Sequence, residues 1–139
     1  MPRLMAIILP SPASTAVRSR PEFEERFKYI YYKIREKHPE IIIVGTAGPG
    51  SHKGNPDYDT GWRIAEDIDL AILDEHYYEP RDYFLNNQQN YDNYPRKRKT
   101  KVYLGEYAAK DKKMADALYE ALYLLGIERN GDVVVMTSY

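Results

Sequence analysis

The stretch Glu40-Ile-Ile-Ile-Val-Gly45 decides the fold that we expect for this chain. Four consecutive β-branched residues ending at a glycine indicate a strand that is buried on both faces, as is typical of a parallel sheet. Three further apolar runs predict strands, Leu70-Ala-Ile-Leu73, Lys101-Val-Tyr-Leu-Gly105 and Asp132-Val-Val-Val-Met136. The sequence therefore predicts about four parallel strands.

Helical patterns alternate with these strands, over residues 21–38, 58–67, 80–94 and 112–127. The first pattern places Phe23, Phe27, Ile30 and Ile34 at helical spacing. The last pattern is the clearest, and its apolar side is expected to face the core. That side consists of Met114, Leu118, Ala121, Leu122 and Leu125. Alternating strands and helices predict an α/β fold with helical crossovers.

Four strands are too few to close an eight-stranded barrel. The last predicted strand also has no helix after it, so we expect a partial (β/α)₈ barrel, one piece of a larger domain. Residues 1–20 are expected to form an irregular N-terminal segment, and residues 21–139 the barrel part. The open sheet would have two exposed edges, and such edges favour self-association into a homo-oligomer.

The composition excludes several classes of protein. The 139 residues include 43% hydrophobic and 29% charged residues, no cysteine, and a net charge of −1. This charge provides no general attraction to nucleic acid or to an anionic membrane. No segment is long enough to span a bilayer, and the apolar run near the N-terminus, about six residues, is short for a signal peptide. Fourteen tyrosines suit either a ring-lined sugar cleft or ordinary half-buried packing.

Polar and aromatic side chains follow each predicted strand. They are Thr46 after the first strand, Asp74, Glu75, His76 and Tyr78 after the second, Glu106 and Tyr107 after the third, and Ser138 and Tyr139 after the fourth. Active sites of parallel α/β folds lie at the carboxyl ends of the strands. The three histidines show no metal-ligand spacing, and no metal or cofactor is expected.

Glu106 is the strongest catalytic candidate, because Gly105 is expected to kink the strand and present this carboxylate at the rim of the sheet. Such a carboxylate can attack an anomeric carbon when a second carboxyl about 5 Å away donates a proton. His76 can hold a substrate hydroxyl or orient Glu106, and Tyr78 can donate a hydrogen bond to Glu106. Glu75 is either a second carboxylate of the site or, as the sequence favours, a salt-bridged structural residue. Tyr107 is a further supporting candidate.

Four runs carry a resemblance to a known family: Asp74-Glu-His-Tyr-Tyr78, Tyr83-Phe-Leu-Asn-Asn87, Val102-Tyr-Leu-Gly-Glu-Tyr-Ala108 and Glu128-Arg-Asn-Gly-Asp-Val-Val-Val-Met136. In this order the chain resembles the C-terminal half of the catalytic barrel of family 51 α-L-arabinofuranosidases. The resemblance implies release of terminal arabinofuranose from arabinan or arabinoxylan with retention. It implies that Glu106 is the nucleophile, and that His76 and Tyr78 contact the sugar and the nucleophile. Members are secreted, periplasmic or cytoplasmic, which leaves localisation open.

The sequence departs from the family before the first predicted helix. The family places its acid/base glutamate in an Asn-Glu motif there, whereas this chain has residues 14–20 without such a motif. The resemblance therefore implies a fragment that carries the nucleophile but lacks the acid/base residue, and that is inactive alone. The alternative is a non-catalytic half-barrel that binds carbohydrate or self-associates.

Overall fold

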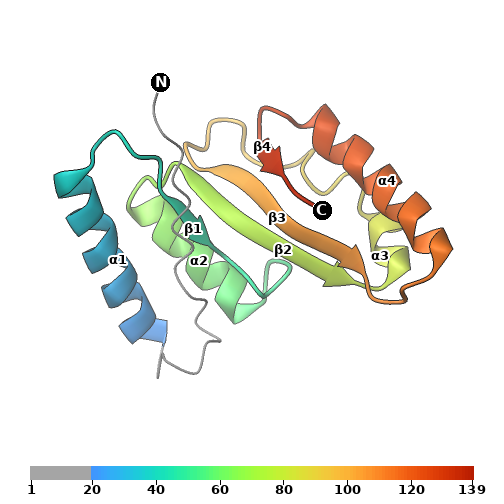
Figure 1. Ribbon diagram of the computed structural model, residues 1–139, viewed down its shortest axis with the longest axis horizontal. Coiled ribbons are helices and arrows are strands. Elements are labelled where there is room, and N and C mark those ends of the chain that lie inside the picture. The colour runs from blue at the N-terminus through green and yellow to red at the C-terminus, as the bar shows by residue number, and fades with distance from the viewer. Residues whose placement is uncertain (1–19) are drawn as a thin grey trace.

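The computed structural model describes residues 20–139, and the expected irregular segment lies almost wholly outside this part of the chain. Helices and strands alternate along the described residues (Figure 1). In chain order they are α1 (Arg20–Lys37), β1 (Val44–Thr46), α2 (Pro56–Asp67), β2 (Ile72–Glu79), α3 (Arg81–Asn86), β3 (Lys101–Ala109), α4 (Met114–Arg129) and β4 (Val134–Thr137).

The four strands form one parallel sheet in the order β1-β2-β3-β4. Each strand pairs with the next strand in the sequence, so every crossover moves one position in the same direction. A doubly wound sheet would reverse its strand order at a switch point, whereas an unbroken sequential order is the pattern of a (β/α)₈ barrel. The predicted partial barrel with four parallel strands and crossover helices is confirmed.

A single hydrophobic core lies between the helices and one face of the sheet. It is rich in tyrosine: Tyr77 of β2, Tyr91 after α3 and Tyr123 of α4 are each 1% exposed, around the fully buried Phe84. The rings of Phe84 and Tyr123 meet edge to face, with centroids 5.3 Å apart. Of the two interpretations of the tyrosine content, packing in the core is the one that accounts for these side chains.

The apolar side of α4 is exposed, contrary to the expectation that it faces the core. Met114, Leu118 and Leu125 are 93%, 69% and 58% exposed. The helix instead buries its opposite side, which includes Glu120, Tyr123, Gly126 and Ile127. Gly126 permits this orientation, because a Cβ atom there would lie 2.0 Å from the carbonyl oxygen of Gln88.

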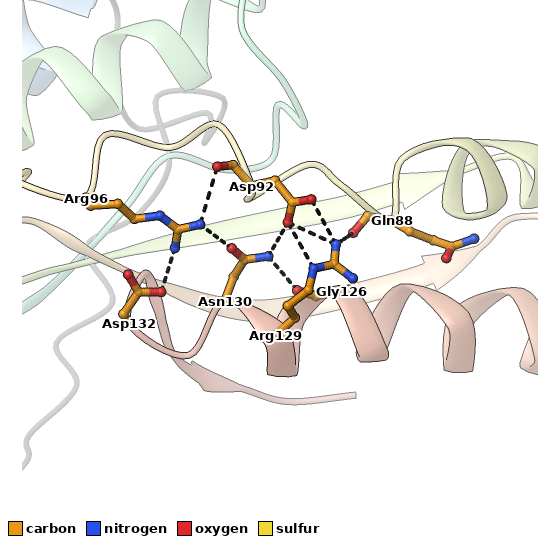
Figure 2. A network of polar contacts seen from close by, with 7 residues as sticks. All are labelled: Gln88, Asp92, Arg96, Gly126, Arg129, Asn130 and Asp132. Carbon is orange, nitrogen blue, oxygen red and sulfur yellow. Dashed lines mark hydrogen bonds and ion pairs between the residues drawn. The ribbon is translucent and has the colours of Figure 1, made fainter.

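The helix expected over residues 80–94 ends at Asn86. Both the backbone N–H and the side-chain amide of Asn87 donate to the carbonyl oxygen of Tyr83, at 2.9 and 2.8 Å, and this caps the helix. The turns that follow are tied to the C-terminal end of α4 by a polar network (Figure 2). In this network Asp92 accepts hydrogen bonds from Arg129 and from the buried Asn130, at 2.9 and 2.7 Å.

Strands β2 and β3 are longer than the sequence predicted. They continue to Glu79 and Ala109, so the polar residues expected after the strands lie inside them. A bulge interrupts their pairing, because Glu75 pairs with Leu104 and His76 with Glu106. Gly105 is therefore the extra residue in β3. Since side chains alternate along a strand, the polar residues are divided between the two faces of the sheet.

Candidate functional site

Asp74, His76 and Tyr78 alternate along β2 and share the sheet face that the helices do not cover. Their neighbours Glu75 and Tyr77 point the other way and are buried, at 0% and 1% exposure. On β3, Leu104 and Tyr107 belong to the core, while Glu106 faces His76 and Tyr78. The structure thus brings together Glu106, His76 and Tyr78, and adds Asp74 to them.

Two side chains of β2 contact the same oxygen of Glu106. The hydroxyl of Tyr78 donates to Oε2 at 2.8 Å, and Nδ1 of His76 lies 3.7 Å from that oxygen. Within residues 20–139, no hydrogen bond or ion pair reaches Oε1 of Glu106. The side chain is 50% exposed and lies on the face of the sheet that the helices do not cover. The hydrogen bond to Glu106 raises the pKa of Tyr78, because an ionised phenol could not donate it.

His76 is held on its other side by Asp74. Nε2 of His76 lies 2.8 Å from Oδ2 of Asp74, whose side chain is 2% exposed. This hydrogen bond is the largest cause that raises the pKa of His76, and the negative charges of Asp74 and Glu106 raise it further. Gly48 packs against the ring, since a Cβ atom there would lie 2.9 Å from Nδ1. The imidazole therefore lies between two carboxylates in a confined position.

Gly105 acts through its lack of a side chain. Its N–H donates to Oδ1 of Asp74 at 3.0 Å, and a Cβ atom would lie 2.2 Å from that oxygen. The expected kink is thus a bulge that makes room for Asp74. The far side of Gly105 is fixed by Ser138, which donates to its carbonyl oxygen at 2.7 Å. Thr46 of β1 lies beside the site and accepts a hydrogen bond from the N–H of Gly48 at 3.0 Å.

Glu75 lies on the opposite face, inside a cage of neutral donors. Oε1 accepts hydrogen bonds from Tyr58, Trp62 and Tyr94 at 2.9, 2.8 and 2.9 Å. Oε2 accepts from Tyr77 and Tyr91 at 3.1 and 3.0 Å. Among the described residues no cation pairs with it, so the salt bridge favoured by the sequence is wrong. Burial raises the pKa of Glu75, and the hydrogen bonds oppose this shift.

Tyr107 also lies on the helix-covered side and is 5% exposed. Its ring packs against Phe84, Tyr123 and Tyr139, and burial raises its pKa. The hydroxyl of Tyr139 donates to Oε2 of Glu120 on α4 at 2.5 Å. Glu75 and Tyr107 are therefore separated from Glu106 by the sheet and contact it through no hydrogen bond.

A hollow of about 510 Å³ borders Tyr78. It is lined by the end of β3, the following loop and the first turns of α4, including Lys110, Lys113 and Asp116, and by Tyr139. A larger hollow, about 640 Å³, lies at the surface between α2 and the turns after α3. Trp62 lines this larger hollow, and the guanidinium of Arg98 covers its ring at 4.2 Å. Of these two hollows, the smaller one reaches the site through Tyr78, and Glu106 and His76 line neither.

Within residues 20–139, no group of three or more His, Asp or Glu side chains is placed to hold a metal ion. Over the same residues, no helix is both long and apolar enough to cross a membrane.

No family model matches the chain. Individual relatives do match. An extracellular exo-α-L-arabinofuranosidase of Streptomyces chartreusis is 38% identical over 85% of the chain. Alpha-L-arabinofuranosidase 2 of Arabidopsis thaliana is 34% identical over 78%, and a probable α-L-arabinofuranosidase A of Aspergillus flavus is 27% identical over 84%. The chain spans 14%, 15% and 17% of these three relatives' lengths.

Among solved structures, an arabinose-bound family 51 α-L-arabinofuranosidase matches 86% of the chain with a TM-score of 0.66. The sequences are 24% identical, and the chain covers 20% of that enzyme. The fold is therefore that of a segment of a glycoside hydrolase barrel. By sequence the chain is homologous to one segment of the α-L-arabinofuranosidases, which confirms the resemblance to family 51.

Proposed function

We propose that Glu106 is the nucleophile of a retaining α-L-arabinofuranosidase site, and that His76 and Tyr78 contact the sugar and the nucleophile. The observation that carries this proposal is that the contacts of Glu106 with β2 involve only one of its two carboxylate oxygens. Tyr78 and His76 both contact Oε2, and this fixes the carboxylate. Oε1 is left to attack an anomeric carbon, which forms a glycosyl ester while the glycosidic C–O bond breaks and the leaving-group oxygen departs.

The proton donor for this reaction is not found beside Glu106 among residues 20–139. Asp74 is engaged by His76 and by the N–H of Gly105, and Glu75 is enclosed on the other face. Loss of a general acid lowers a rate by about 10²–10⁴-fold. We therefore infer that the 139-residue chain by itself hydrolyses arabinofuranosides negligibly, and that residues 21–139 act as the C-terminal half of a catalytic barrel.

The substrate class follows from the relatives, which are all named as α-L-arabinofuranosidases. For the site around Glu106 we propose terminal arabinofuranose of an arabinose-containing oligosaccharide or polysaccharide. The hollow beside Tyr78 supplies lysine and carboxylate side chains, which can exchange hydrogen bonds with the hydroxyl groups of a neighbouring sugar.

A substrate whose leaving group needs no protonation tests the nucleophile without the acid. Dinitrophenyl α-L-arabinofuranoside is incubated with the chain, and the intact mass is then measured. We expect one pentosyl adduct, which peptide mapping places on Glu106. The adduct should persist, because its hydrolysis needs a general base. An adduct on another residue, or no adduct, would contradict the proposal.

Glu106→Gln is the variant expected to form no adduct, and Glu128→Gln is its matched control at an exposed position. The control should react like the wild-type chain. A nitrophenyl arabinofuranoside that needs acid assistance should give negligible turnover with all three proteins. Turnover at ordinary glycosidase rates would refute the inference that the chain is inactive alone.

A non-catalytic, self-associating half-barrel is the second candidate, and the exposed apolar side of α4 favours it. Two of these sheets can close into one ring, because β4 of each copy can pair with β1 of the other. This arrangement would satisfy both open edges. In such a ring α4 would lie beside α1 of the other copy. Helix α1 carries two exposed tyrosines, Tyr29 and Tyr32, which are 65% and 56% exposed.

A further inference from the structure

Asp74 is a buried carboxylate with both oxygens engaged. Oδ2 contacts Nε2 of His76 at 2.8 Å, and Oδ1 accepts the N–H of Gly105 at 3.0 Å. Neither contact is a cation of fixed charge, since His76 is charged only when it is protonated. A buried carboxylate of this kind is stabilised when its imidazole partner carries a proton on both nitrogens.

The orientation of the His76 ring decides which nitrogen faces Glu106. A carboxylate oxygen accepts hydrogen bonds, so Nε2 carries the hydrogen that lies toward Asp74. Nδ1 is then the nitrogen that faces Oε2 of Glu106, at 3.7 Å. If Nδ1 were bare, its lone pair would face a negative oxygen. If it is protonated, the ring links the two carboxylates as a cation.

No positively charged side chain faces the His76 ring among residues 20–139, so no cation disfavours its protonation. From β2 the ring faces Asp74, and from β3 it faces Glu106. The hydroxyl of Tyr78 is directed to Glu106. The segment after β1 contributes Gly48, which packs against the ring. Thr46, the last residue of β1, lies beside Gly48 and is uncharged. Asp74 and Glu106 are therefore the charges that determine the protonation of His76.

We propose that Asp74 is a positioning residue for Glu106. It fixes the ring of His76 and keeps it as an imidazolium beside Oε2. That cation and the Tyr78 hydroxyl hold Glu106 as an oriented anion with Oε1 outward. The role of Glu106 as nucleophile rests on the proposed function, whereas the Asp74–His76–Glu106 linkage does not require it.

The titration of His76 in the intact 139-residue chain tests this linkage. Imidazole resonances are followed by NMR from acid to alkaline pH in wild type and in Asp74→Asn. In wild type the pKa of His76 is expected above the ordinary value of a histidine, because the hydrogen bond to Asp74 and the charge of Glu106 favour the protonated ring. In Asp74→Asn we expect the pKa of His76 to fall, because the group that most favours the protonated ring has lost its negative charge. An unchanged His76 would overturn the proposal.

Two controls separate positioning from a general change of charge or of fold. Asp82→Asn removes one negative charge at an exposed site on α3, and should leave His76 unchanged. If Asp74→Asn does not fold, the test uses the wild-type chain alone. The ¹⁵N chemical shifts of the His76 ring then show which nitrogen keeps its proton in the neutral form. A neutral form with its proton on Nε2 supports the proposal, and a proton on Nδ1 overturns it. No sugar is used, so this result is independent of adduct formation at Glu106.

Discussion

Position 105 requires a glycine, because the carboxylate of Asp74 occupies the space that a Cβ atom would need. The same carboxylate accepts the N–H of Gly105, so the glycine both admits and anchors it. The sequence identified this glycine as the residue that presents Glu106. The structure adds that its more direct role is to let Asp74 approach the backbone of β3.

Gly105→Ala is expected to destabilise the chain, because the new Cβ atom would lie 2.2 Å from Oδ1 of Asp74. Forcing a side chain into a filled site typically costs about 1–3 kcal/mol. Urea denaturation measures the change in the free energy of unfolding. Gly131→Ala is the control, since its Cβ atom would meet only the carbonyl oxygen of Glu128 at 3.6 Å. Equal effects of the two substitutions would contradict this interpretation of Gly105.

At the scale of elements, the cage around Glu75 joins three segments that are distant in the sequence. Tyr58 and Trp62 come from α2, Tyr77 comes from β2, and Tyr91 and Tyr94 come from the turns after α3. One carboxylate thus organises the packing of a helix and a long connection against the sheet. The polar network of Figure 2 joins the same connection, through Gln88, Asp92 and Arg96, to residues at the C-terminal end of α4.

Glu75 should make stability depend on pH in a defined direction. Burial raises its pKa above 4.5, so the folded chain binds this proton more tightly than the unfolded chain does. The resulting stabilisation is present below the unfolded pKa and is lost as the pH rises through the folded pKa. Glu75→Gln removes it. The difference in the free energy of unfolding, wild type minus variant, should therefore fall as the pH rises above 4.5.

Urea denaturation at a series of pH values measures this difference. Glu128→Gln serves as the control, because it removes a carboxylate from the exposed surface without touching the cage. Its difference from wild type should change little over the same range. A Glu75→Gln difference that stays constant or rises with pH would contradict the expected effect of burial.

At the scale of the whole molecule, β1 and β4 are the edge strands of the sheet formed by residues 20–139. Helix α4, which exposes Met114, Leu118 and Leu125, lies in the half of the molecule that includes β4 (Figure 1). Exposed apolar side chains that gather on one side of a helix are typical of a surface against which another surface packs. If the chain is a self-associating half-barrel, a second copy of the chain packs against this side of α4.

Leu118→Glu and Leu125→Glu place charges on this exposed side, where the residues are 69% and 58% exposed. In the self-associating candidate the wild-type chain is a dimer, and either substitution shifts it toward monomer without lowering its stability. Size-exclusion chromatography with light scattering measures the mass. Gln89→Glu, which adds the same charge at another exposed position, should leave the dimer intact. A strictly monomeric wild-type chain would exclude this candidate.

The sequence determined the class of fold because its strongest signals are local. Apolar runs such as Leu70-Ala-Ile-Leu73 and Val102-Tyr-Leu104 indicate buried strands, and their alternation with helical patterns indicates parallel crossovers. The run Ile41 to Val44 marked the place of β1 only approximately, because the strand begins at Val44 and continues to Thr46. It also identified Glu106, His76 and Tyr78 as candidates, because the chain order of strand and polar residue is visible without coordinates. Period-two alternation along Asp74-Glu-His-Tyr-Tyr78 could have added Asp74 to the same face.

Only the tertiary structure decided on which face of the sheet, or on which side of a helix, each side chain lies. Strands β2 and β3 run past their apolar segments, and a bulge resets their register, so Glu75 lies among tyrosines while His76 meets Glu106. The orientation of α4 likewise depends on the contact of Gly126 with a turn 38 residues earlier in the chain, at Gln88. Such choices are set by contacts between distant segments, and hydrophobic periodicity contains no information about which partner each segment meets.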